Sequence, residues 1–596
     1  MTAITNIDQL PGSFPDPSSL SVFTDDEAVS IARTVAPQIV ALLTSPEKDD
    51  FAQLFLAGAF WRDLVALSWT LRTFHPTSAI TESVVPLIKR ASIDCSSIRL
   101  DEAHVVAIPF PNGVSVVRAP FTFTTSSPST QCTAAFKIVR LSTGHLKVLT
   151  VTTALHEVNS IPWRKFDLPA AFSPTVPTTL DVLVVGGGHA GLSIAAYLKA
   201  LGVDFVVVEK QNAIGDSWSK RYDSTTLHTT RVFSGLPFVG FPSDYPQYIP
   251  AKLIANYYTD YVNKLHLPVY CGRECVSATW DASSDRWEVT LNDISGNQTI
   301  RVRTLVFATG IGGRFPLVPD LPGKDAFKGQ VLHSIDYTSA SRWAGKRVAI
   351  VGASTTACDV ALDCVKAGVE VVTMIQRGAT RIYPQEHITR VQARFWNDDI
   401  PVEVGDSMAT EDPMVLSAAL SSIVLKQLQN SYSPEFYAGL KNAGFIAAVD
   451  GSVHQQIYCR AGAHYPDIGA CGAISRGEIQ VKSDANIDRI LPTAIAFSDN
   501  TRLDTDVIVY CTGFEKDARN TAAAIIGKDT ANILEPVWGL DAEGEVRGCW
   551  RPSGHHRIWF HGGELQTMRY YGRFLAMQIA AEIAGVRPSP ARAVNP

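Results

Sequence analysis

The feature of this chain that most constrains its fold is a βαβ pattern that occurs twice. In the first copy, an apolar run at 181–185 leads into a turn at 186–191 with the sequence GGGHAG, then a helical segment and a second apolar run at 205–209. The second copy has the same order between Arg347 and Met374. A strand, a tight turn, a helix and a parallel strand form the unit that binds dinucleotides. We therefore expect an α/β protein with two Rossmann-like dinucleotide-binding units.

The first turn has the complete glycine pattern of such a unit. Gly186 permits the tight turn, Gly188 lets the backbone approach a pyrophosphate, and Gly191 allows close packing of helix on strand. The N-terminus of the helix, at His189 and Ala190, offers unpaired N–H groups to the phosphates. Glu209 ends the second strand, where a carboxylate can bind both ribose hydroxyls. The first site is predicted to bind a dinucleotide without a 2′-phosphate.

The second turn departs from this pattern. Gly352 is present, but Ser354 and Ala357 stand where the other two glycines would be. Alanine is compatible with the third position, and the serine hydroxyl can donate a hydrogen bond to a phosphate. The strand that follows ends at Arg377 with no acidic residue, and an arginine there pairs with a 2′-phosphate. We therefore expect NADPH rather than NADH at this site, with a solvated strand-end cation as the alternative interpretation of Arg377.

Composition excludes several function classes. The 596 residues include 52 Lys and Arg against 58 Asp and Glu, which gives a formal net charge of −6. The chain lacks the broad basic field that attracts nucleic acid or an anionic membrane, so small molecules are the expected partners. Ten scattered cysteines, no secretory leader and no transmembrane segment favour a cytoplasmic protein. The histidines 555, 556 and 561 lack a carboxylate or cysteine to complete a metal site, so none is predicted.

The first 160 residues differ in character from the rest. Asp49 and Asp50 can cap a helix that continues through apolar positions to Trp69. Short β-like runs follow at 104–108, 114–117, 135–139 and 146–151. Helices packed on an antiparallel sheet are the expected result, as a separate α+β unit. The proline-rich segment 161–179 is typical of a linker.

Five further segments carry a family resemblance. They are VFATG at 306–310, VYCTGF at 509–514, GDSWSKRY at 215–222, LHT at 227–229 and FKGQVLHSIDY at 327–337. Together they resemble the flavin-containing monooxygenases, whose identifying sequence is Phe-x-Gly-x-x-x-His-x-x-x-Tyr. The likeness extends from about residue 180 to 590 and is highly specific. The motif ends in Tyr337 followed by Thr338, whereas the family usually continues with Lys or Pro.

Within that family, the chain is most similar to the YUCCA-type branch and its fungal and bacterial relatives. The segments AGF at 443–445, YPDIG at 465–469 and GEI at 477–479 carry this likeness. The segments FWRD at 60–63 and WTLRTF at 69–74 resemble the nuclear-transport-factor-like (SnoaL-like) cone that precedes the monooxygenase in many of those relatives. Such a cone can serve as a structural lid or as a homodimer contact, and a second active site is the less favoured interpretation.

The resemblance implies a domain order in which an FAD domain is interrupted by an NADP domain. The implied ranges are 1–160 for the α+β unit, 161–179 for the linker, 180–340 for the first part of the FAD domain, 341–504 for the NADP domain with a substrate-pocket insertion, and 505–596 for the returning part of the FAD domain.

The resemblance also implies a reaction. NADPH reduces FAD, molecular oxygen adds at the flavin C4a, and the resulting hydroperoxide transfers one oxygen atom to a lipophilic substrate. His228 is the candidate flavin-facing group, with a backbone-satisfied histidine as the alternative. Trp218 and Arg221 are expected along the flavin and His333 near NADP or in a structural turn. The predicted cofactor-binding residues are Gly186, Gly188, His189, Ala190, Gly191, Glu209, Lys210, Trp218, Arg221, His228, Thr309, Gly310, His333, Gly352, Ser354, Thr355, Thr356, Arg377, Thr512 and Gly513.

Several reactions and classes remain open at this stage. N- or S-oxygenation of an aromatic or alkaloid-like molecule and oxidative decarboxylation of a 2-oxo acid fit the family, and a Baeyer–Villiger reaction is the alternative. Baeyer–Villiger enzymes carry Trp in place of Tyr337. A disulfide reductase is disfavoured because neither CxxxxC nor CxxC stands at the expected place, and the flavin motifs argue against a non-catalytic NADP sensor. Segment 383–477 is the expected source of substrate-pocket residues.

Overall fold

The computed structural model describes residues 4–110, 114–164, 166, 175–310, 315–430, 433–448 and 451–588. Residues 165 and 167–174 of the proposed linker therefore lie outside the described residues. Within them, the chain forms three main sheets and two small three-stranded ones. The mixed α/β fold class and the two Rossmann-like units are confirmed.

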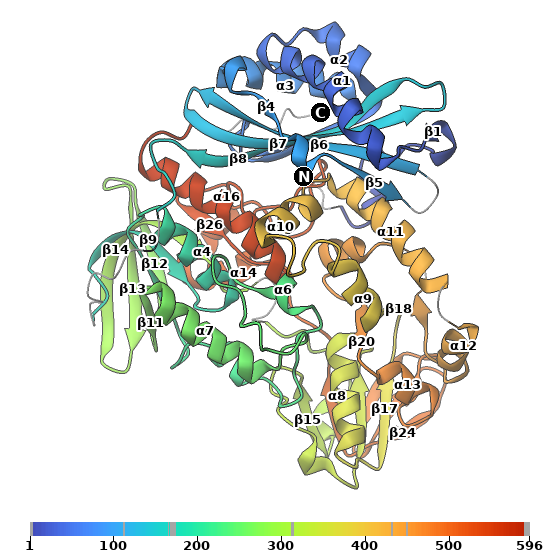
Figure 1. Ribbon diagram of the computed structural model, residues 1–596. Coiled ribbons are helices and arrows are strands. Elements are labelled where there is room, and N and C mark those ends of the chain that lie inside the picture. The colour runs from blue at the N-terminus through green and yellow to red at the C-terminus, as the bar shows by residue number, and fades with distance from the viewer. Residues whose placement is uncertain are drawn as a thin grey trace.

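The front sheet is formed by the first 158 residues (Figure 1). Its strands follow the order β3-β2-β8-β7-β6-β4, with β1 on β7 and β5 on β6. The long strands alternate buried and exposed residues along part of their length, as half-buried antiparallel strands do. The bounds are β1 Leu20–Ser21, β2 Phe55–Leu64, β3 Leu71–Phe74, β4 Arg99–Leu100, β5 Val106–Phe110, β6 Val114–Ser126, β7 Ser129–Leu141 and β8 Leu146–Val158.

Three helices, α1 Asp25–Thr44, α2 Lys48–Leu54 and α3 Thr77–Ala91, cover the outer side of the front sheet (Figure 1). The helix expected to reach Trp69 ends at Leu54, and the segment from Phe55 to Leu64 is strand β2, so that prediction was wrong beyond residue 54. From Phe60 onward every residue of this strand is buried, on both faces. A strand that is buried on both faces lacks the two-residue alternation of polar and apolar side chains by which a strand is recognised in a sequence. The four expected β runs are confirmed.

The second sheet carries the first glycine turn. Its order is β11-β10-β9-β14-β13-β12, with β26 on β14, and strands β9, β10, β11 and β26 run parallel to their neighbours. Helix α4, His189–Ala200, is the crossover from β9 to β10 and packs against α16, Leu565–Ile583. The strand bounds are β9 Thr179–Val185, β10 Phe205–Glu209, β11 Val269–Cys271, β12 Glu274–Asp281, β13 Arg286–Asp293, β14 Gly296–Phe307 and β26 Ile558–Phe560.

The third sheet carries the second turn and is parallel throughout, in the order β15-β25-β16-β17-β21. Helix α8, Thr355–Lys366, crosses from β16 to β17. Strands β15 and β25 come from ranges assigned to the FAD domain, so the chain enters this sheet earlier and leaves it later than predicted. The strand bounds are β15 Gln330–His333, β16 Arg347–Val351, β17 Val371–Ile375, β21 Gln480–Lys482 and β25 Val507–Tyr510.

The two small sheets have the orders β19-β18-β20 and β22-β23-β24. The first is parallel and lies beside the third sheet (Figure 1). Their bounds are β18 Thr380–Pro384, β19 Ala447–Ala448, β20 His464–Asp467, β22 Ile487–Leu491, β23 Ala494–Phe497 and β24 Arg502–Asp504.

Helices fill the space between the third sheet and the front sheet. The helices used below are α5 Asp216–Ser219, α6 Arg231–Ser234, α7 Ala251–Leu265, α9 Gln385–Gln392, α10 Val402–Thr410, α11 Met414–Asn430 and α12 Pro434–Asn442. Among the described residues no single helix is long and apolar enough to cross a membrane; only α10 and α11 taken together pass that test, with a bend of 98° between them.

Buried ion pairs join the inner face of the front sheet to the rest of the chain. Arg62 of β2 contacts Glu545 at 2.7 Å and also donates to the Tyr571 hydroxyl of α16 at 2.8 Å. Arg118 of β6 contacts Glu411, which directly follows α10, at 2.8 Å. Each of these charged side chains is at least nine-tenths buried. In Figure 1 this face lies directly over α10, α11 and α16. The front sheet is therefore held in one position over the two nucleotide units.

Candidate functional site

The first glycine turn has the geometry that its sequence predicts. Gly186 adopts φ +108°, and a Cβ there would lie 2.6 Å from the Ala308 carbonyl oxygen. A Cβ at Gly191 would lie 1.8 Å from the Gly186 oxygen, which shows how closely α4 packs on the turn. At Gly188 the nearest atom is 3.9 Å away, so this backbone is open to a ligand. The residues present therefore fit a bound pyrophosphate.

The carboxylate of Glu209 lies against the same turn. It accepts hydrogen bonds from the Gly187 N–H at 2.7 Å and from the Gln211 N–H at 2.8 Å. Both bonds hold the carboxylate at the end of β10, where a ribose would lie over the turn. Lys210 follows it and is exposed.

The predicted residues at the start of α4 are buried. The His189 ring shares a hydrogen bond of 2.7 Å between Nδ1 and the Tyr258 hydroxyl, and burial lowers the pKa of His189 to about 3. The imidazole is therefore neutral. The positive charge at this turn comes only from the partial charge of the helix N-terminus. Ala190 is buried beside it.

Thr-Gly segments close both turns in the same way. Thr309 and Gly310 follow β14, whose last residue pairs with Val185 at the end of β9. Thr512 and Gly513 follow β25, whose last residue, Tyr510, pairs with the end of β16. The Thr512 hydroxyl donates to the Leu317 carbonyl. The two segments therefore lie at equivalent places, one beside each glycine turn.

The second turn is equally tight but carries more side-chain hydrogen bonds. Gly352 adopts φ +131°, and a Cβ there would lie 2.5 Å from the Cys511 carbonyl oxygen. The hydroxyls of Ser354 and Thr355 both donate to the His464 carbonyl, at 2.8 and 2.9 Å. These bonds attach strand β20 to the turn.

The other predicted residues of the second unit lie nearby. Thr356 is partly exposed in the first turn of α8, and Ala357 is fully buried where a third glycine would stand. Arg377 follows the end of β17 and is exposed. Its guanidinium makes no hydrogen bond or ion pair with the described residues, so it is available to a ligand.

The segment from Trp218 to His228 links the two units. The Arg221 guanidinium lies 4.3 Å from the centre of the Trp218 ring, a cation–π contact. Nε2 of His228 lies 3.5 Å from a carboxylate oxygen of Asp359 in α8, and the Tyr222 hydroxyl donates to the other oxygen at 2.7 Å. The structure therefore brings His228, from the first unit, against the nucleotide helix of the second.

Two further features of this junction matter for chemistry. The His228 side chain is 11% exposed, and its buried Nδ1 has no partner among the described residues. His333 ends β15, where its Nδ1 accepts the Ile335 N–H at 3.2 Å and burial lowers its pKa. Its Nε2 also lacks a partner among the described residues. Two imidazole nitrogens, Nδ1 of His228 and Nε2 of His333, are therefore free to bind a ligand.

Sequence reasoning missed two residues of this region. Asp359 stands on α8 among core residues, and nothing in its sequence context marks it as part of the junction. Arg381 is 4% exposed in β18, although arginine in a sequence is more often a surface residue. The only sequence signal for Arg381 was its position two residues before the predicted pocket segment, in ATRIYP at 379–384.

An open pocket of about 350 Å³ begins two residues after His228. Its volume is within the range of small-molecule sites. Trp396, from the segment expected to supply substrate contacts, is one wall. The lining residues are Thr230, Arg231, Val232, Tyr245, Gln247, Ala393, Trp396, Asn397 and Asp398.

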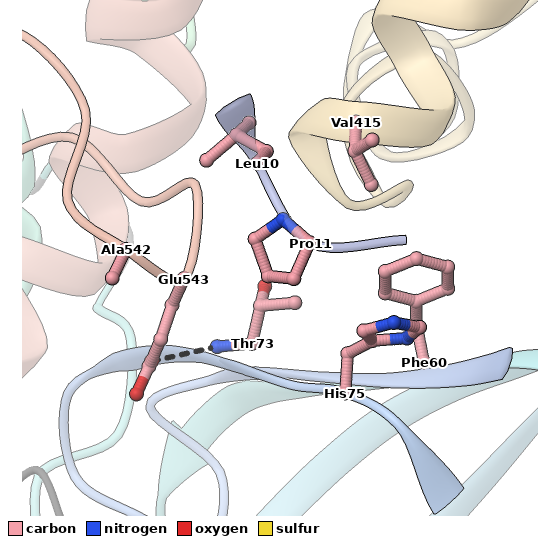
Figure 2. A pocket seen from close by; sticks show the side chains of 8 residues that line it. All are labelled: Leu10, Pro11, Phe60, Thr73, His75, Val415, Ala542 and Glu543. Atoms are coloured by element: carbon pink, nitrogen blue, oxygen red, sulfur yellow. Dashed lines mark hydrogen bonds between the residues drawn. The ribbon is translucent and has the colours of Figure 1, made fainter. Parts of the chain in front are cut away.

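A second pocket, shown in Figure 2, lies where the front sheet meets α11 and the loop at 541–545. His75 and Phe60 stack on one side of it, and Glu543 accepts the Thr73 N–H on the other. At about 60 Å³ it is much smaller than a substrate site. In the part of the chain that the structure describes, no group of three His, Cys, Asp or Glu side chains could hold a metal ion.

Comparisons with known proteins agree with this arrangement. Residues 183–397 match the family model described as pyridine nucleotide-disulphide oxidoreductase. All ten cysteines are free. The chain is 28% identical to the probable indole-3-pyruvate monooxygenase YUCCA9 of Arabidopsis thaliana, over 56% of this chain and 75% of that protein. It is 26% identical to the indole-3-pyruvate monooxygenase YUCCA8 of Oryza sativa subsp. indica, over 68% of this chain and 90% of that protein.

Among solved structures, a flavin-containing monooxygenase from Stenotrophomonas maltophilia is 18% identical with a TM-score of 0.47, over 68% of this chain and all of that one. Cyclohexanone monooxygenase in an open crystal structure is 19% identical with a TM-score of 0.49, over 69% of this chain and 89% of that one. The sequence matches carry the comparison: the chain is similar to flavin-containing monooxygenases, in particular to the YUCCA-type enzymes, and is an oxidoreductase.

Proposed function

We propose that this protein uses NADPH, FAD and molecular oxygen to transfer one oxygen atom to a lipophilic small molecule. The observation that carries the proposal is the junction of the two units. His228 follows the first glycine turn in sequence and lies 3.5 Å from Asp359 on the helix of the second. Reacting rings bound at both turns would meet at such a junction.

The first turn supplies the FAD site. Gly186, Gly188 and Gly191 hold the pyrophosphate against the N-terminus of α4, and Glu209 binds the adenosine ribose. The second turn supplies the NADPH site, in which Gly352 and Thr356 lie at the phosphates and the exposed Arg377 pairs with the 2′-phosphate.

Bound FAD supplies the redox chemistry, since it takes hydride from NADPH and passes electrons to oxygen. The side chains orient the reactants and exclude water. His228 presents its unpaired Nδ1 at the junction, where an imidazole nitrogen can accept or donate one hydrogen bond. The Asp359 carboxylate lies 3.5 Å from Nε2 of that ring, and Tyr222 fixes Asp359 by a hydrogen bond. Trp218 and Arg221 extend the wall on the side of the first turn.

The substrate is proposed to enter through the 350 Å³ pocket beside Trp396. An aromatic or alkaloid-like molecule suits this wall, by N- or S-oxygenation or by oxidative decarboxylation of a 2-oxo acid. Tyr337 donates a hydrogen bond to Asp363 of α8 and is fully buried. Baeyer–Villiger enzymes carry Trp at this place. Ester formation from a ketone is therefore less favoured than these reactions and is kept as the alternative.

A glycine substitution tests the proposal without disturbing the fold. In Gly188→Val the new side chain occupies the space open to the pyrophosphate, so the purified protein should fold but lack FAD and NADPH-dependent oxygen uptake. Gly240→Val is the matched control, because nothing lies within 4 Å of its Cβ position, and it should keep both. A wild-type protein that contains no flavin, or flavin that NADPH does not reduce without oxygen, would refute the proposal.

A further inference from the structure

A buried arginine without a partner lies outside the residues used so far. Arg381 is in the central strand of the small sheet β19-β18-β20 and is only 4% exposed. Its backbone N–H donates to the Ala463 carbonyl at 3.0 Å, so the strand holds it in place. Nε and Nη1 of its guanidinium are buried and have no hydrogen-bond partner among the described residues.

An unpaired buried guanidinium lowers the stability of the folded state. Its N–H groups have lost water without gaining an acceptor, and no carboxylate among the described residues forms an ion pair with it. The planar N–H pair of arginine matches the two oxygens of a carboxylate or a phosphate. A ligand that carries such a group would satisfy both free positions at once.

Two neighbours of Arg381 also have buried polar atoms without hydrogen-bond partners in the described part of the chain. In the parallel register Arg381 is opposite His464 of β20, so both side chains are on one face of the sheet. Tyr383, two residues along the strand, is on the same face, and its ring centre lies 6.4 Å from that of His464. The Tyr383 hydroxyl and Nδ1 of His464 are buried and lack partners among the described residues. Gly451 lies against Nη2, where a Cβ would come within 2.9 Å.

Strand β20 also reaches the junction of the two units. Tyr465, which follows His464 and is on the opposite face of the strand, packs at 6.4 Å from His228, ring centre to ring centre. Burial lowers the pKa of His464, which is therefore neutral and can donate or accept one hydrogen bond. This face of the sheet therefore carries one permanent positive charge, one phenol and one imidazole.

We propose that Arg381 binds an oxyanion of a small-molecule ligand, with Tyr383 and His464 as further hydrogen-bonding groups. The location in the ligand pocket of a monooxygenase rests on the proposed function; the binding of an oxyanion does not. A substrate carboxylate and a cofactor phosphate are the two sources of this chemistry. Thr380, the preceding residue, donates to the Ala353 carbonyl of the second turn at 2.8 Å. Because side chains alternate along a strand, Arg381 points away from that turn, which favours the substrate.

Calorimetric titration of the purified full-length protein tests this assignment. Phenylacetate and its uncharged amide, phenylacetamide, serve as probes for a carboxylate, and NADP⁺ and NAD⁺ serve as probes for the phosphate. Arg381→Gln should weaken phenylacetate binding about tenfold to hundredfold and leave phenylacetamide unchanged. Arg381→Lys should lose less, since it keeps the charge. Arg394→Gln, at an exposed arginine just after α9, is the matched control.

The outcomes separate the sources. Weaker phenylacetate binding with unchanged NADP⁺ binding supports a substrate oxyanion. Weaker NADP⁺ binding with unchanged NAD⁺ binding supports an oxyanion site that serves the cofactor. Unchanged affinities for both anions overturn the proposal. If Arg381→Gln does not fold, Arg381→Lys and the preference of the wild type for phenylacetate over its amide decide the question. Failure of the proposed function would instead be seen as flavin that NADPH does not reduce.

Discussion

The hydroxyl of Tyr222 donates a 2.7 Å hydrogen bond to the buried carboxylate of Asp359. One helical turn later, Tyr337 donates in the same way to Asp363. Two tyrosines therefore bind two carboxylates on one helix, α8: Tyr222 comes from the first unit, and Tyr337 follows strand β15 of the second. The contact of Tyr222 with Asp359 joins the two nucleotide units at the place where two bound cofactors would meet.

Removal of the first contact should destabilise the junction. In Tyr222→Phe the carboxylate of Asp359 keeps only His228 at 3.5 Å, so we expect a loss of about 1–3 kcal/mol in the free energy of unfolding. Thermal unfolding followed by fluorescence measures it. Tyr245→Phe is the control, because the structure gives its hydroxyl no hydrogen bond among the described residues. Equal melting of the two variants would mean that the contact does not hold the units.

The ion pair between Arg62 and Glu545 should matter far more than an exposed one. Both side chains are 3% exposed, and Glu545→Gln leaves the arginine charged and buried, at an expected cost of about 3–5 kcal/mol. The exposed pair between Arg33 and Glu102 is the control, and Glu102→Gln should change the stability far less than Glu545→Gln does. A small effect of Glu545→Gln would show that the front sheet is held by its apolar contacts alone.

Acid should weaken the same contact. Burial alone would raise the pKa of Glu545, but the charge and hydrogen bonds of Arg62 outweigh it and hold the pKa below the usual 4.5. A lowered pKa stabilises the fold above the unfolded-state value and loses this effect as pH falls through the folded-state value. The difference in Tm between wild type and Glu545→Gln should therefore be constant above pH 4.5 and shrink below it.

Glu564 should show the opposite sign. It occupies the N-cap position of α16 without a side-chain capping hydrogen bond, and burial raises its pKa from 4.5 to about 7. A raised pKa gives stability that is fully present below 4.5 and is lost as pH rises through about 7. Glu564→Gln should therefore raise Tm by roughly a few degrees above pH 7 and have little effect near pH 4.5. A Tm difference that does not vary with pH would refute this assignment.

Much of this organisation could be predicted from the sequence, and the limits have physical causes. Gly186, Gly188 and Gly191 act within one local turn, so their spacing alone predicts their geometry. Asp359 and Arg381 depend on contacts between segments at least 70 residues apart in the chain, such as that of His228 with Asp359 and that of Gly451 with Arg381, and no local pattern records those. The strand from Phe55 to Leu64 was mistaken for helix because it is buried on both faces from Phe60 onward.

Arg377 provides a test of cofactor choice. Its guanidinium is exposed at the end of β17 and makes no hydrogen bond or ion pair with the residues that the structure describes. Arg377→Ala should raise the KM for NADPH about tenfold to hundredfold and leave the KM for NADH almost unchanged. Steady-state flavin reduction with each nucleotide measures both values. Equal increases would mean that Arg377 does not contact the 2′-phosphate.

The central claim is that the junction at His228 directs oxygen to a substrate rather than releasing it as hydrogen peroxide. The most direct measurement reduces the flavin with NADPH under anaerobic conditions, adds oxygen, and follows flavin reoxidation and hydrogen peroxide together. We predict that hydrogen peroxide appears only after a lag in the wild type, and that the lag shortens in His228→Ala and is largely kept in His228→Asn. Immediate release of one equivalent of peroxide by the wild type would contradict the account.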